Sequence, residues 1–264
     1  MPDQTPAAAA AEAIAALDEL TRRLRVECPW DREQDERTIV PHTLEEAYEL
    51  ADAAQRRDDG KLLDELGDVL FQVHFLSLLL EERGAGSLAD VAEHVRQKLI
   101  RRHPHVFGEA EVENAGEVLR NWDAIKATEA GREPGIFGEV PENLPSLLYA
   151  RKVQRRVATT GMDVDEPPYG AVFGQLEVVE TAADADARFE AVGDLLFAAV
   201  NVARKLKVDP ELALRSSADR FRARVEGAER LAAADGAAWN DLDPGRQINY
   251  YAQARLQEED DPTP

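Results

Sequence analysis

The sequence predicts an all-α fold made of tandem helical-bundle domains. Residues that favour helices dominate the 264-residue chain, and aromatic residues make up only 6% of it. No stretch alternates apolar and polar residues between hairpin turns, as half-buried strands do. The segment "GDVLFQVHF" at 67–75 recurs as "GDLLFAAVN" at 193–201. A repeat with a period of about 125 residues indicates two copies of one domain.

Helical periodicity predicts ten helices, five in each half of the chain. The first is an alanine-rich stretch near the N-terminus, and the third is apolar on almost every side from residue 69 to residue 80. A helix of that kind is expected to be buried. The predicted ranges are 8–26, 43–57, 61–83, 87–102 and 114–129, then 145–157, 170–183, 186–207, 210–234 and 244–258.

A proline- and glycine-rich stretch separates the two halves. "GREPGIFGEVPENLP" at 131–145 contains three prolines and three glycines, which interrupt helical periodicity. We therefore expect one domain at 1–130, a linker at 131–145 and a second domain at 146–264. The C-terminal "QEEDDPTP" is acidic and contains proline, so we expect it to be frayed or disordered.

Composition limits the classes of function. The formal net charge of -21 disfavours nonspecific binding to nucleic acid or to an anionic membrane. Cys28 is the single cysteine, no run of 18 apolar residues suggests a membrane span, and the N-terminus lacks the basic start of a secretory signal. We expect a cytoplasmic protein.

Five acidic residues stand out at the start of the second and third predicted helices. Their pattern is acid-acid-x-x-acid, a spacer, and acid-x-x-acid: Glu45, Glu46, Glu49, Glu65 and Asp68. We expect Leu44, Ala47, Tyr48, Ala51 and Ala54 to form the core stripe of the second helix, with the glutamates beside it. An alternative fits Glu46, because Thr43-Leu-Glu-Glu matches a capping box.

Several ionised carboxylates at the mouth of a packed bundle need a cation. Neither acidic helix has histidine or cysteine at matching spacing, which argues against zinc and against a ferritin-like di-iron site. Oxygen ligands alone favour Mg²⁺, with Mn²⁺ as a substitute. Because Mg²⁺ retains open positions for phosphate oxygens, we expect a phosphate-bearing ligand. Basic residues able to meet it cluster locally, with Trp122 on the same predicted helical face as the last of them: Lys61, Arg96, Lys98, Arg101, Arg102, His103, His105 and Lys126.

These residues resemble the MazG family of nucleoside triphosphate pyrophosphohydrolases. The similar segments are "CPWDREQ" (28–34), "TLEEAYEL" (43–50), "DELGDVLFQV" (64–73), "RRHPHVFG" (101–108) and "NWDAIK" (121–126). The resemblance implies tandem MazG-like domains that hydrolyse an NTP or dNTP to the monophosphate and pyrophosphate. It also implies a role in clearing non-canonical nucleotides and assembly as a homodimer or higher homo-oligomer.

The resemblance also implies roles for single residues. Glu46, Glu49, Glu65 and Asp68 would bind Mg²⁺, and the catalytic role of Glu45 would be either to support these ligands from behind or to help orient the attacking water. Lys61, Lys98, Arg102 and Lys126 would contact phosphates, and Trp122 would lie near the base.

The second half departs from the acidic pattern. Aligned on "GDLLF", it has Leu176, Glu177 and Glu180 for the first three acids, and Ala191 and Asp194 for the last two. With two of five acids missing, we expect this half to be catalytically weak or inactive. An alternative for the whole chain is a non-catalytic helical scaffold that senses nucleotides or binds a partner.

Overall fold

The computed structural model describes residues 5–129, 135–138 and 140–260, and every regular element in these ranges is a helix. The all-α prediction is therefore confirmed. In chain order the helices are α1 (Pro6–Glu27), α2 (Pro29–Glu33), α3 (Glu36–Arg56), α4 (Asp59–Glu82), α5 (Leu88–Arg102), α6 (Pro104–Phe107), α7 (Ala115–Thr128), α8 (Ser146–Ala158), α9 (Tyr169–Thr181), α10 (Ala185–Lys205), α11 (Pro210–Ala234), the 3₁₀ helix η1 (Trp239–Asp241) and α12 (Pro244–Asp260).

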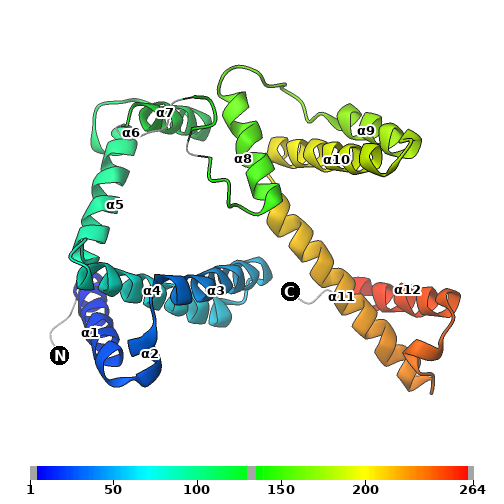
Figure 1. Cartoon of the computed structure of the whole chain (residues 1–264), viewed down its shortest axis with the longest axis horizontal. Helices are drawn as coiled ribbons and strands as arrows, with labels where there is room; N and C mark the ends of the chain where they lie inside the picture. The colour runs from blue at the N-terminus through cyan, green and yellow to red at the C-terminus, as the bar shows by residue number, and fades with distance from the viewer. Residues whose placement is uncertain (1–4, 130–134, 139, 261–264) are drawn as a thin grey trace. The chain divides into compact units, whose positions relative to one another are not determined.

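The chain divides into two compact units, Met1–Ala130 and Gly131–Pro264. Each unit contains a hairpin of two packed helices, α3–α4 in the first and α9–α10 in the second (Figure 1). The repeated segments lie on the second helix of each hairpin, since 67–75 belongs to α4 and 193–201 to α10. Residues 131–134 and 139 of the expected linker lie outside the described residues.

The largest error in the predicted helices concerns α3, which begins at Glu36 and not near Thr43. Asp35 is its N-cap, and its carboxylate accepts the backbone N–H of Arg37 and of Thr38. Pro41 is accommodated inside the helix. Thr43 is therefore an interior residue, and the predicted capping box of Thr43 and Glu46 is wrong.

Other differences are smaller. The short helices α2, α6 and η1 were not predicted, because segments of three to five residues show no periodicity. At the C-terminus α12 continues to Asp260, so the expectation of fraying is wrong for residues 257–260. The remaining residues of that tail, 261–264, lie outside the described residues.

The buried face of α3 differs from the expected stripe. Leu44, Ala47 and Ala54 are exposed, whereas Ile39 and Ala53 are buried. Ile39 packs with Phe75 and Leu79 of α4 in the core of the first unit. Glu46 lies seven residues, or about two turns, from both Ile39 and Ala53, so it shares the face that meets α4. This orientation determines which acidic residues approach one another.

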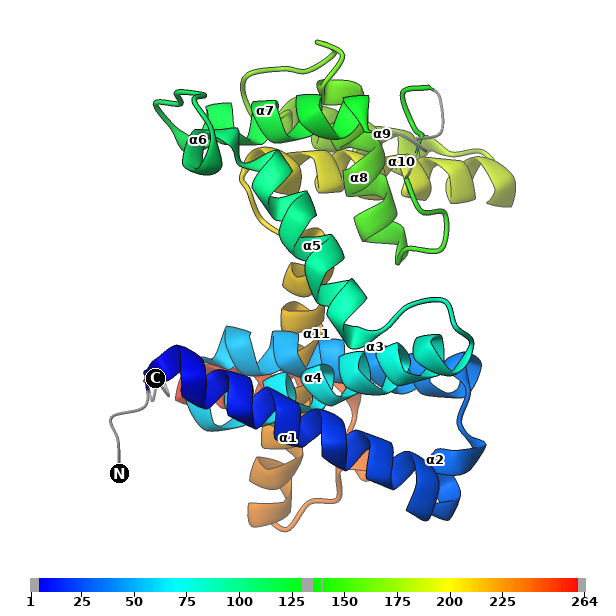
Figure 2. The same ribbon diagram turned by 90° about the vertical axis from the view of Figure 1, so that its left-hand side faces the viewer.

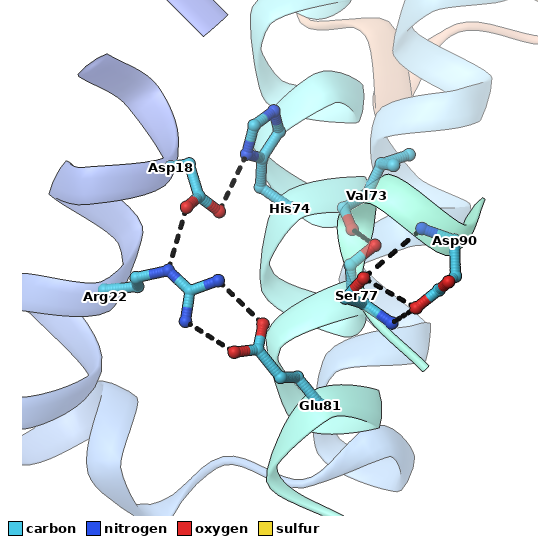
Figure 3. Close-up of polar contacts among 8 residues, drawn as sticks. Asp18, Arg22, Val73, His74, Ser77, Glu81 and Asp90 are labelled. Atoms are coloured by element: carbon cyan, nitrogen blue, oxygen red, sulfur yellow. Dashed lines mark hydrogen bonds and ion pairs between the residues drawn. The ribbon is translucent and has the colours of Figure 1, made fainter. Parts of the chain in front are cut away.

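Ion pairs join α1 to α4 (Figure 3). The Arg22 guanidinium donates to Asp18 on its own helix and to both carboxylate oxygens of Glu81 on α4. His74, which is buried, has its Nδ1 3.8 Å from Asp18 Oδ1. One turn further along α1, Arg25 donates to Glu82 and to two backbone carbonyls beyond α1. These contacts hold α1 against α4.

The core of the second unit joins α11 to α12. Ala228 and Ala232 of α11 are buried against Tyr250 and Ala254 of α12, with Leu242 between the two helices. The Tyr250 hydroxyl donates to Asp235 at the end of α11. In the part of the chain that the structure describes, none of the helices is long and apolar enough to cross a bilayer.

Candidate metal and phosphate site

Three carboxylates converge where α3 packs on α4. Glu46 and Glu49 lie one turn apart on α3, and Glu65 lies in the second turn of α4. One oxygen from each lies within 4.8 Å of the other two. The short α3–α4 connection places the end of α3 beside the beginning of α4, so acids some 16 residues apart in the chain become neighbours. We call these three residues the acidic group.

The carboxylates of the acidic group repel one another. Burial raises the pKa of Glu46, and the charges of Asp68, Glu49 and Glu65 raise it further. Glu65 is only 4% exposed. Lys61 Nζ lies 3.3 Å from Glu65 Oε1 and 3.8 Å from Glu49 Oε2, and the hydrogen bond to Glu65 raises the pKa of Lys61. One ammonium beside three carboxylates leaves negative charge that a cation would neutralise.

The donor set fits a hard divalent ion. All three donors are carboxylate oxygens, which Mg²⁺, Mn²⁺ and Ca²⁺ prefer, whereas zinc favours imidazole and thiolate. Asp68, the fourth predicted ligand, is exposed and stands beside Glu46 but outside the acidic group. It lines a surface depression together with Lys61 and Asp64. The structure thus gathers three of the four predicted ligands and places the fourth next to them.

The Glu45 side chain is not part of the acidic group. Its carboxylate lies 3.2 Å from His42 Nδ1 on the preceding turn, and its side chain is 67% exposed. No motif in the sequence marks His42. The Thr43 hydroxyl donates a hydrogen bond to the amide oxygen of the buried Gln72, and this bond links α3 to α4. An interior Thr43 was not expected, so this contact could not be anticipated.

Two of the other predicted phosphate and base contacts, Arg102 of α5 and Trp122 of α7, lie together in a separate cluster. The Arg102 guanidinium pairs with Glu129 and lies 5.2 Å from the centre of the Trp122 ring, and the His103 ring is 5.0 Å from the same ring. Hydrogen bonds from Arg102, and also from Arg101, lower the pKa of Glu129 to about 2. Glu129 was not predicted, because it lies 27 residues from Arg102 in the sequence.

The two clusters are not brought together within one unit. Helix α5 follows the C-terminal end of α4, whereas the acidic group lies near the beginning of α4. Helix α7, which carries Trp122 and Lys126, packs on α5, and α5 extends away from the α3–α4 hairpin (Figure 2). Lys98 is part of α5 as well. Lys61, by contrast, contacts the acidic group directly.

The second unit has a different set of groups at the corresponding positions. Ala191, which aligns with Glu65, is buried at 3% exposure, and Asp194 is exposed. Glu177 and Glu180 are also exposed on α9. Among the residues that the structure describes, the acidic group of the first unit is the one set of three His, Cys, Asp or Glu side chains arranged to hold a metal ion.

Comparison with known proteins agrees with the geometry. Residues 34–107 match the MazG nucleotide pyrophosphohydrolase domain, a range that contains the acidic group and Lys61. The chain is 38% identical over 242 residues to the nucleoside triphosphate pyrophosphohydrolase of Escherichia coli K12, covering 88% of this chain and 92% of the relative. It is 37% identical over 231 residues to the nucleoside triphosphate pyrophosphohydrolase/pyrophosphatase MazG of Thermotoga maritima, covering 86% and 89%. A similarly named protein of Mycolicibacterium smegmatis is 32% identical over 193 residues, covering 72% and 56%. The chain therefore belongs to the MazG nucleotide pyrophosphohydrolase family.

Proposed function

We propose that this protein is a Mg²⁺-dependent nucleoside triphosphate pyrophosphohydrolase that works through its first unit. The observation that carries the proposal is the convergence of the Glu46, Glu49 and Glu65 carboxylates within 4.8 Å, beside Lys61. Relatives that match most of this chain are named nucleoside triphosphate pyrophosphohydrolases. The reaction adds water to the α-phosphorus and breaks its bond to the bridging oxygen, releasing a monophosphate and pyrophosphate.

The acidic group and Asp68 would hold the ion, with Mn²⁺ as a substitute. Bound there, Mg²⁺ supplies charge neutralisation at the phosphates and lowers the pKa of coordinated water. Glu65 is buried and fixed by the packing of α4, so it orients the ligand set. Lys61 already lies within 4 Å of two carboxylates. Once those carboxylates bind an ion, the Lys61 ammonium is available to a phosphate oxygen at the same place.

Turnover with individual nucleotides tests this proposal. Purified protein is incubated with each NTP and dNTP plus Mg²⁺, and the products are separated by chromatography. We expect monophosphate and pyrophosphate, lost in Glu49→Gln and retained in the matched variant Asp194→Asn of the second unit. Diphosphate and phosphate as products would contradict the reaction. No turnover by folded protein would favour the alternative of a nucleotide-binding scaffold.

We further propose that a second copy of the chain completes the site. The cluster of Arg102 and Trp122 lies apart from the acidic group in one unit, and both are needed to bind phosphates and base at once. Large apolar side chains beside the acidic group are exposed, with Leu44 at 58%, Leu63 at 74% and Leu66 at 50%. Such a surface is typical of an interface between subunits.

Complementation between two inactive variants tests the shared site. Glu49→Gln lacks a metal ligand, and Arg102→Met lacks the guanidinium beside Trp122. In a dimer with two shared sites, mixing equal amounts after unfolding and refolding restores roughly a quarter of the sites, because half of the dimers are mixed and each has one intact site. The absence of any recovery, in protein shown to be dimeric by light scattering, would place Arg102 outside a shared site.

A further inference from the structure

Gln72 is a buried polar residue of α4 that the proposed ligand set does not include. Its side chain is 6% exposed, and its Oε1 accepts a hydrogen bond from the Thr43 hydroxyl of α3 at 3.4 Å. The two N–H groups of the amide are on Nε2, and no described residue accepts a hydrogen bond from them. A buried donor without an acceptor is costly. The amide is therefore held by Thr43 on one side and has two unused donors on the other.

An unused acceptor lies one turn earlier on α4. Asp68 precedes Gln72 by four residues, so the two side chains share a face of the helix. Long side chains on a helix lean towards its N-terminus, which directs Gln72 towards Asp68. The Asp68 carboxylate is exposed, and no described residue donates a hydrogen bond to it. Glutamine and aspartate at this spacing form side-chain hydrogen bonds, so the unused donor and the unused acceptor suit each other.

Asp68 is also the predicted ligand that the acidic group leaves out. Its charge raises the pKa of Glu46, so it lies near that group, although its oxygens are outside the set that lies within 4.8 Å. Like charges repel, so a further carboxylate joins such a group only with compensation. A hydrogen bond from an amide holds the carboxylate in place. Because the amide is neutral, it adds no positive charge that would compete with a bound cation.

The internal repeat shows that packing alone does not require glutamine at this position. Alignment of the repeat matches Gln72 with Ala198 of α10, which is buried at 9% exposure. When the two acidic segments are aligned, Thr43 matches Gly174. The second unit therefore lacks both partners of the Thr43–Gln72 hydrogen bond, and it also lacks two of the five acids. The polar pair accompanies the complete acidic pattern and is missing where that pattern is incomplete.

We propose that Gln72 is a positioning residue that holds Asp68 in the metal site, an inference that rests on the proposed function. When the ion is bound, Gln72 Nε2 donates to one oxygen of the Asp68 carboxylate and leaves the other oxygen for the ion. Thr43 fixes the orientation of the amide by donating to its Oε1. With Asp68 held in this way, the site binds a hard divalent cation more tightly than three carboxylates alone would.

Calorimetric titration of the full chain with MgCl₂, without nucleotide, tests this role. Gln72→Met removes the amide at nearly constant volume and should weaken Mg²⁺ binding by about tenfold or more. Asp68→Ala should also weaken it, and adding Gln72→Met to Asp68→Ala should cause no further loss. The control is Gln55→Met, which changes an exposed glutamine of α3 and should bind Mg²⁺ as wild type does. In turnover assays, Gln72→Met should require more Mg²⁺ for half-maximal rate, with kcat recovered at saturating Mg²⁺.

The outcomes separate this role from the proposed hydrolysis. Equal Mg²⁺ affinity in Gln72→Met and wild type would overturn the role, as would losses that add in the double variant, since a merely structural effect does not depend on Asp68. Mg²⁺ binding without turnover of any nucleotide would overturn the proposed function and leave the role of Gln72 intact. A folded wild type that binds no Mg²⁺ would overturn both. If Gln72→Met does not melt cooperatively, Gln72→Ala decides, because the repeat has alanine at this position.

Discussion

Replacing Glu46 by glutamine is expected to stabilise the metal-free protein and to weaken its stabilisation by Mg²⁺. An oxygen of Glu46 lies within 4.8 Å of one from Glu49 and one from Glu65. At that separation, two unit charges repel by about 1 kcal/mol in water and about 3.5 kcal/mol at an effective dielectric constant of 20. Because Glu65 is buried, the repulsion between Glu46 and Glu65 lies towards the upper end of this range. Glu49 is exposed, so the repulsion between Glu46 and Glu49 lies towards the lower end. Since the new amide can lose solvation, we expect a net gain of about 1 to 3 kcal/mol in the free energy of unfolding.

The gain should depend on pH in a defined direction. Burial and neighbouring charges raise the pKa of Glu46, so the folded state binds its proton more tightly than the unfolded state does. The unfavourable contribution of Glu46 therefore appears as pH rises through the unfolded pKa of about 4.3, and it is absent well below that pH. Urea denaturation in EDTA at pH 7 and pH 3.5 measures both values. Glu46→Gln should be more stable than wild type at pH 7, with a smaller difference at pH 3.5.

Addition of Mg²⁺ provides the second half of this test. An ion at 100 times its dissociation constant stabilises a folded protein by about 2.7 kcal/mol, and a tenfold weaker site reduces the gain to about 1.4 kcal/mol. The matched control is Glu45→Gln, because Glu45 is adjacent in sequence but lies outside the acidic group. Its effect should stay within about 0.5 kcal/mol. A Glu46→Gln variant that is less stable in EDTA, or equally stabilised by Mg²⁺, would refute the reasoning.

Three further outcomes follow from the structure. Glu129→Gln should lower the melting temperature at pH 6 and have little effect near pH 2. The pKa of Glu129 is lowered from 4.5 to about 2, so the stability that its carboxylate contributes declines below pH 4.5 and is lost as pH falls through about 2. An equal effect at both pH values would contradict this. Arg25→Met should lower the free energy of unfolding by about 2 kcal/mol in urea titrations, and Arg22→Met by less than about 1 kcal/mol. The reason is that Arg25 donates to two backbone carbonyls and is less exposed than Arg22. A larger loss in Arg22→Met would contradict this. Arg57→Gly should raise the free energy of unfolding by about 0.5 to 1 kcal/mol. Arg57 ends α3 in the left-handed region, with a φ of 55°, which glycine adopts without strain. A loss of stability would show that contacts of the Arg57 side chain outweigh the backbone strain.

Element type was predictable from the sequence because the helical periodicity is strong. The predicted range 210–234 coincides with α11, and the range 87–102 differs from α5 by one residue. The start of α3 was not predictable from the same reasoning. The capping-box pattern that begins at Thr43 suggested a boundary there, yet the cap at Asp35 lies upstream and Pro41 fits inside the helix. Local signals of similar strength competed, and packing of Ile39 into the core favours the longer helix.

The acidic group was largely predictable, whereas its surroundings were not. Spacing on two helices selected Glu46, Glu49 and Glu65, and an α3–α4 hairpin necessarily brings such positions together. The pairing of Arg102 with Glu129 depends on how α7 packs on α5, and no local pattern encodes that packing. Leu44 was predicted to lie in the core because it falls on the apolar stripe of its helix, but it is exposed. Periodicity identifies an apolar stripe, but it does not say whether the stripe meets the same chain or a second copy.

The contrast between Glu65 and Ala191 shows how the two units have diverged. Both residues lie at the same register of the repeat, and both are almost fully buried, at 4% and 3% exposure. A buried carboxylate is costly unless it is paired, so Glu65 is retained at an energetic disadvantage that an ion and Lys61 would offset. Alanine at the same register carries no such cost. The second unit is thus free of the need for a cation at this position, whereas the first unit keeps a buried carboxylate whose charge an ion would neutralise.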